Sequence, residues 1–241
     1  MINMNLPAIV LAAMAGDYLA RFLSLYLLSK IVMKLKMPRR GAVASLGKKV
    51  DKFNREIEEV QDFIKTIESC RKITDKHKHW CYQQGIIRIY RVFEVLILNC
   101  LVALLNKDAS HLKEAAGIKL SKNFYLSQDT SRFVVTGGEY FNFRNYDGLI
   151  KECRRFLPDD HQLICALRGH KKTIEKMTAL RNFSAHDSHK AKAQMKKVLR
   201  MDRPGEPGKW LRGGKNKPGD PIQDLIKEFE KLAGAISSIA K

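Results

Sequence analysis

The sequence lacks an uninterrupted apolar run that could cross a lipid bilayer. A membrane-spanning helix needs ~20 consecutive apolar residues, whereas the apolar runs 6–15 and 22–33 are separated by Asp17 and Arg21. We therefore expect no stable membrane insertion. Lysines follow the second run, so the segment 6–36 is compatible with an interfacial helix on a membrane surface. The interpretation that we favour is a helix buried in the core or in a subunit interface.

Several catalytic signatures are also missing. The chain has no glycine-rich phosphate loop, no His-Glu-x-x-His and no Gly-x-Ser-x-Gly. His77, His79 and Cys81 alternate with other residues, and this spacing is not that of common structural zinc sites. We therefore expect neither a bound metal nor an organic cofactor.

Cysteine is scarce, and the spacing of the cysteines does not suggest disulfide pairs. The five cysteines are scattered and odd in number, which argues against a disulfide framework. No basic segment precedes the first apolar run, as a secretory signal would require. The sequence therefore predicts a cytoplasmic protein with reduced thiols.

Acidic residues are few compared with basic ones. Lys and Arg number 44 against 25 Asp and Glu, which gives a formal net charge of +19. The excess is concentrated: residues 165–218 hold 15 Lys/Arg and 4 Asp/Glu, a balance of +11. Such a field attracts polyanions such as nucleic acid. The alternative is a basic surface that is merely solvated.

Apolar residues recur at the three- and four-residue steps of helices through most of the chain. The pattern predicts helices over 49–72, 82–106, 146–156 and 222–239, and one long helix over 160–199 that is capped by Asp159 or Asp160. The helix over 82–106 is apolar on nearly every side, so it should be buried.

Two segments interrupt this helical pattern. Residues 120–145 combine Gly137-Gly138 with several aromatic residues, which suggests a loop or a short hairpin. Residues 203–221 are rich in Gly, Pro and basic residues around Trp210 and are predicted to form a loop. The whole is an all-α bundle over 46–202, preceded by an apolar helical extension over 1–45 and followed by a basic Gly/Pro loop and C-terminal helix over 203–241.

The most informative stretch is Leu-Arg-Asn-Phe-Ser-Ala-His at 180–186. A guanidinium such as that of Arg181 can hold phosphate oxygens, and an imidazole such as that of His186 can move a proton near neutral pH. Asn182 and His186 share a helix face, but Arg181 and His186 diverge by about 140° on an ideal helix. A kinked helix end, or a second copy across a dimer axis, would bring the two groups together.

This segment resembles the signature of the HEPN superfamily, in which an Arg, usually followed by Asn, precedes a His by a short spacer. The stretch Arg88-Ile-Tyr-Arg-Val-Phe-Glu-Val-Leu-Ile-Leu is similar to the early core helix of that family, and the motif arrives on a later helix. The resemblance covers roughly residues 50–200. It implies a HEPN-like helical bundle with a short irregular or hairpin insertion before the motif helix.

The resemblance further implies a metal-independent endoribonuclease of toxin or phage-defence type, with Arg181, Asn182 and His186 as catalytic residues. Family members pair their motif helices across a homodimer, and an antitoxin or other defence-system partner is possible. The basic residues expected to bind RNA are Arg168, Lys171, Lys190, Lys192, Lys196, Lys197 and Arg200. The alternative is a non-catalytic RNA-binding or protein-interaction subunit, in which Arg181 pairs with an internal acid such as Glu94.

Overall fold

The computed structural model describes residues 45–110, 112, 125–203, 205–213 and 220–239. Within these residues the protein is all-α, as the sequence predicts, and none of them forms a strand. The expected N-terminal extension over 1–45 lies outside the described residues apart from its last position. Within the described part of the chain, no helix is both long enough and apolar enough to cross a membrane.

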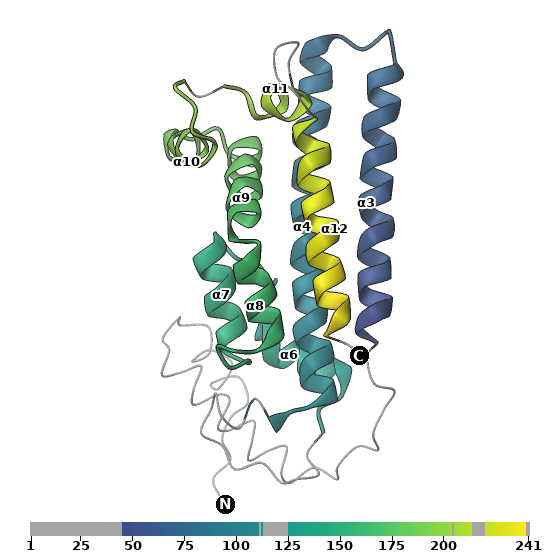
Figure 1. Ribbon diagram of the computed structural model, residues 1–241, viewed down its shortest axis with the longest axis vertical. Coiled ribbons are helices and arrows are strands. Elements are labelled where there is room, and N and C mark those ends of the chain that lie inside the picture. The colour runs from purple at the N-terminus through teal and green to yellow at the C-terminus, as the bar shows by residue number, and fades with distance from the viewer. Residues whose placement is uncertain (1–44, 111, 113–124, 204, 214–219, 240–241) are drawn as a thin grey trace, which may run out of the picture.

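Three long helices lie side by side along the molecule: α3 (Leu46–Ser69), α4 (Asp75–Lys107) and α12 (Pro221–Ser238) (Figure 1). On the other side of α4, the helices α8 (Gln162–Gly169) and α9 (Lys171–Ala185) follow one another nearly end to end. The shorter α7 (Tyr146–Arg154) packs beside them. The predicted helices over 49–72, 146–156 and 222–239 are thus confirmed, with small shifts of their ends.

Helix α4 is the centre of the core. The Thr74 hydroxyl accepts a hydrogen bond from the backbone N–H of His77 and so begins the helix. Its apolar side chains face the neighbouring helices on several sides, and Ile86, Ile89, Phe93 and Ile97 are fully buried. Phe93 meets Phe229 of α12 edge-on, with 5.0 Å between ring centroids. The expectation of a buried central helix over 82–106 is confirmed.

Helix α6 (Gln128–Thr136) occupies part of the segment for which a loop or hairpin was expected. That expectation was wrong for these residues. The Ser127 hydroxyl accepts from the N–H of Thr130 and begins the helix, and Gly137 ends it in the left-handed conformation at φ 65°. Residues 137–145 are irregular.

The single long helix expected over 160–199 is also wrong, because the chain breaks twice. The first break is at His170, between α8 and α9, and α8 is capped by His161 rather than by Asp159 or Asp160. The second break follows Ala185. The Ser188 hydroxyl then accepts from the N–H of Ala191 and begins α10 (His189–Leu199).

Residues 207–212 form a short helix, α11 (Pro207–Arg212), inside the expected Gly/Pro loop. Arg212 attaches α11 to the turn between α3 and α4: its Nε donates to Glu68 Oε1 and its Nη1 to Asp75 Oδ1, both at 2.7 Å. Gly208 lies directly against the backbone of His79, where a Cβ atom would come within 1.9 Å of the carbonyl oxygen. Trp210 is half-buried and packs against the hydrophobic core.

Candidate functional site

The Arg-Asn-x-x-x-His motif lies where α9 ends. Ala185 is the last helical residue, and His186 leaves the helix with φ −141° and ψ 99°. The backbone N–H of His186 still donates to the carbonyl oxygen of Asn182 at 2.9 Å. The side chain of His186 is exposed. The helix thus ends at the motif itself, which is one of the two arrangements that the sequence required for Arg181 and His186 to serve one ligand.

Arg181 is half-buried and held by its neighbours. Its Nη1 donates to Asn182 Oδ1 at 3.0 Å, and its guanidinium carbon lies 4.9 Å from the ring centroid of Tyr90 on α4. Tyr90 is itself fixed, because its hydroxyl donates to the carbonyl oxygen of Phe143 at 2.7 Å. A guanidinium placed over an aromatic face gains electrostatic attraction and loses mobility.

Glu94 lies one helical turn after Tyr90 on α4 and is only 3% exposed. Burial raises the pKa of its carboxyl group, and the nearby positive charge of Arg181 opposes that rise. The Tyr140 hydroxyl donates weakly to Glu94 Oε2 at 3.5 Å. The sequence named Glu94 as an acid near Arg181, and the structure brings the two residues within electrostatic range. No direct ion pair joins these two described residues.

Arg181 and His186 are both described residues, and no hydrogen bond joins their side chains. Arg181 faces Tyr90 and Asn182, whereas His186 is exposed beyond the helix end. In one protomer, the guanidinium of Arg181 and the imidazole of His186 are therefore close in sequence, but they do not face a common point.

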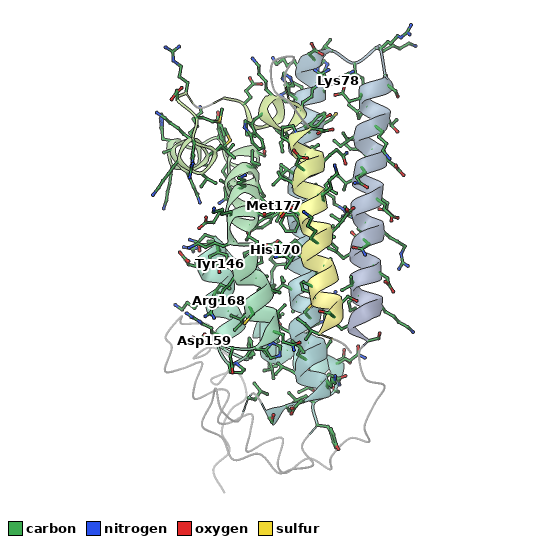
Figure 2. All side chains as sticks on the ribbon, in the orientation of Figure 1. Lys78, Tyr146, Asp159, Arg168, His170 and Met177 are labelled. Carbon is green, nitrogen blue, oxygen red and sulfur yellow. The ribbon has the colours of Figure 1, made fainter. Side chains whose placement is uncertain are left out.

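Helix α10 carries several basic side chains near the motif, and Figure 2 shows nitrogen-tipped side chains radiating from it. Ala191 and Met195 are buried and hold α10 against α9. Among the basic residues of α10, Lys192 is already engaged within the protein: its Nζ pairs with Asp187 Oδ1 at 3.1 Å and lies 5.4 Å from the centroid of the Phe183 ring. The exposed basic residues of α10 and its C-cap are Lys190, Lys196, Lys197 and Arg200.

Arg168 and Lys171 lie elsewhere. Lys171 begins α9 and Arg181 is near its end, which puts about 15 Å along the helix axis between them. Arg168 donates to the carbonyl oxygen of Asp159 at 2.9 Å, and Lys171 pairs with Glu175 at 3.8 Å. Figure 2 shows Arg168 beside Asp159, well away from α10. The structure therefore gathers the RNA-binding candidates of α10 near the motif, and it does not bring Arg168 and Lys171 to them.

No group of three or more His, Cys, Asp or Glu residues that could hold a metal ion occurs in the part of the chain that is described. His77 instead contacts Thr74 Oγ1 through Nδ1 at 2.9 Å, and His79 approaches Glu206 at 3.6 Å. All five cysteines are free, and burial raises the pKa of the Cys100 and Cys153 thiols, which makes both poor nucleophiles.

Sequence reasoning missed two residues that shape this site, Tyr90 and Tyr140. Tyr90 supports Arg181, and Tyr140 bridges Glu94 and Arg91, whose Nη1 donates to the Tyr140 hydroxyl at 2.9 Å. The four-residue spacing of Tyr90 and Glu94 puts both on one face of α4 and was a usable signal. Tyr140 comes from an irregular segment, so no periodicity could place it.

Comparison of this chain with protein-family models, curated proteins and solved structures found no match. The fold and the motif geometry therefore carry the functional argument.

Proposed function

We propose that this protein is a metal-independent endoribonuclease of HEPN type. The observation that supports this most strongly is the end of α9: an exposed His186 stands immediately after the helix, beside Arg181 and Asn182 and next to the basic helix α10. An imidazole, a guanidinium and a basic helix thus lie within one short segment of the chain.

RNA carries its own nucleophile, so cleavage needs only proton transfer and stabilisation of charge on the phosphate. The 2′-hydroxyl attacks the adjacent phosphorus while an imidazole removes its proton, and the P–O bond to the 5′ oxygen breaks. That oxygen takes a proton from a second group, and a 2′,3′-cyclic phosphate remains. Arg181 stabilises the negative charge that builds on the non-bridging oxygens, and Asn182 orients the guanidinium.

The second proton-transfer group is His186 of a second copy. A two-fold dimer that pairs the ends of the two α9 helices would bring two imidazoles to one groove, because a two-fold axis repeats the same patch on both subunits. The exposure of His186 leaves it accessible for this arrangement. In cells, the activity fits a toxin or phage-defence effector in the cytoplasm, restrained by an antitoxin or another defence partner.

A non-catalytic RNA-binding or protein-interaction subunit is the second candidate, and the setting of Arg181 favours it. That guanidinium is half-buried, stacks on Tyr90 and offsets the buried charge of Glu94. A purely structural role for Arg181 would produce the same contacts with Tyr90 and Glu94.

Cleavage of RNA in excess EDTA separates the two candidates. We expect the wild-type dimer to produce 2′,3′-cyclic or 3′-phosphate ends and to leave DNA intact, since DNA has no 2′-hydroxyl. His186→Ala should lower the rate by about 10²-fold or more. His189→Ala is the matched control, because His189 is equally exposed and lies three residues further along. If purified dimer binds RNA without cutting it, the binding-subunit function is correct.

A further inference from the structure

A cavity of about 470 Å³ lies between α4, α6 and the irregular segment after α6. Its floor is formed by Glu94, Val95 and Leu98 of α4, and Phe133 and Tyr140 stand at its sides. Both aromatic rings are unusually open for large apolar side chains, at 48% and 57% exposed. A volume of this size is in the range of small-molecule sites, which run from about 300 to 1,000 Å³.

The cavity is lined by a buried carboxyl group whose hydrogen bonds are incomplete. Glu94 is 3% exposed, and its Oε1 has no donor at hydrogen-bonding distance among the described residues, although the backbone of Phe143 is near enough to lower the pKa of the carboxyl group. Its other oxygen receives the weak 3.5 Å bond from the Tyr140 hydroxyl. Leaving a buried carboxylate oxygen unsatisfied costs free energy, and an N–H group on a bound molecule would recover it.

The charges around the cavity disfavour an anionic ligand. Arg132 is opposed there by Asp129 and Glu139, and all three side chains are exposed. Arg91 lies just outside and donates to the Tyr140 hydroxyl. With a carboxylate on the floor and balanced charges on the rim, an anionic group would be repelled from the interior. A flat, uncharged molecule with N–H donors on one edge fits best.

We infer that this cavity binds one unpaired nucleobase that carries an exocyclic amine: adenine, cytosine or guanine. The base would stack against Phe133 or Tyr140, as single-stranded nucleic acids do on exposed aromatic rings. Its amine would donate to the Glu94 carboxylate, which lines the cavity. Uracil has no exocyclic amine, and its single N3–H donor lies between two carbonyl oxygens that the carboxylate would repel.

This inference rests on the proposed function, since it makes the cavity the specificity site of the same RNA-binding surface. Tyr90, on which Arg181 stacks, precedes Glu94 by one helical turn, about 5.4 Å along α4. The cavity therefore begins one helical turn from the ring on which Arg181 stacks, while His186 and α10 lie toward the other end of the bundle (Figure 1). A base held there would select which phosphate is cut.

Binding of single nucleotides tests the inference without any need for cleavage. AMP, CMP, GMP and UMP carry the same phosphate, so differences among them report the base. We expect at least one amine-bearing nucleotide to bind wild-type protein about tenfold more tightly than UMP, the effect of one charge-assisted hydrogen bond. In Glu94→Gln the preference should disappear, because an amide can both donate and accept. Glu58→Gln, on an exposed position of α3 outside the cavity, is the matched control and should keep it.

Phe133→Ala provides a second readout, since an exposed ring can be removed without disturbing the core. We expect it to weaken the preferred nucleotide about tenfold through loss of stacking. Equal binding of all four nucleotides, or a preference that survives Glu94→Gln, would overturn the inference. So would Glu94-dependent binding of arginine methyl ester in their place, which would make this a cation site. A protein that cuts RNA without this preference would sink the inference and leave the proposed function standing.

Discussion

Replacement of Arg181 by alanine should destabilise the fold as well as abolish cleavage, and the two effects can be separated. The guanidinium lies 4.9 Å from the Tyr90 ring centroid, a contact worth about 0.5–2 kcal/mol. It also supplies positive charge near Glu94, which is buried. A buried charged group that loses its compensation costs on the order of 1–3 kcal/mol.

Together these losses predict a decrease of about 1.5–5 kcal/mol in the free energy of unfolding for Arg181→Ala. In a chain of this size that corresponds to a Tm lower by about 3–20 °C. His186→Ala should change the free energy by no more than about 0.5 kcal/mol, because its side chain is exposed. Thermal and urea denaturation of the purified variants measure both.

The double variant Arg181→Ala/Glu94→Gln is the decisive control. Glu94→Gln removes the charge that Arg181 compensates, so much of the lost stability should return, while RNA cleavage should stay about 10²-fold or more below wild type. If Arg181→Ala has the same Tm as the wild-type protein, the proposed contact with Tyr90 and Glu94 is wrong. If the double variant regains full cleavage, Arg181 has only a structural role.

Three further outcomes follow from named contacts. Gly208→Ala should lower the Tm by several degrees, because its Cβ would meet the His79 backbone. Gly169 has open space around it, so Gly169→Ala should have the Tm of the wild-type protein. Equal Tm values for the two variants would contradict the packing of α11. Charge reversal at Lys196 and Lys197 should weaken RNA binding for all sequences and reduce the salt slope by roughly 0.7 per lost phosphate contact, measured by titration at several salt concentrations, and an unchanged slope would mean that α10 does not bind phosphate. Because the pKa of Glu94 is raised above its ordinary value of 4.5, the native state holds the extra proton, so the free energy of unfolding should fall as the pH rises from about 4.5 through the native pKa. Glu94→Gln should lack that slope in urea denaturation followed against pH, and identical slopes for the two proteins would refute the assignment.

The sequence alone determined the fold class and most of the helices. Apolar residues at three- and four-residue steps have one physical solution, a helix that turns that face to a core, and α3, α4, α7 and α12 follow it. The nearness of Arg181, Asn182 and His186 was also set by the sequence, since they lie within six residues of one another; the lysines of α10 are near them because α10 packs against α9. Whether these residues cleave RNA is a prediction that the experiments above will test.

Only the tertiary structure decided where the helices break and which residues meet across them. The apolar pattern continues through His170 and past Ala185, and periodicity does not report the local contacts at these two interruptions. At the first, the ring Nδ1 of His170 contacts the carbonyl oxygen of Ala166 at 3.0 Å; after the second, Ser188 caps α10. Arg168 stays far from α10 because α8 and α9 extend the chain along the bundle. Glu94 lies near Arg181 and also lines the cavity, because α4 packs against both α9 and α6. That packing is a property of the whole fold.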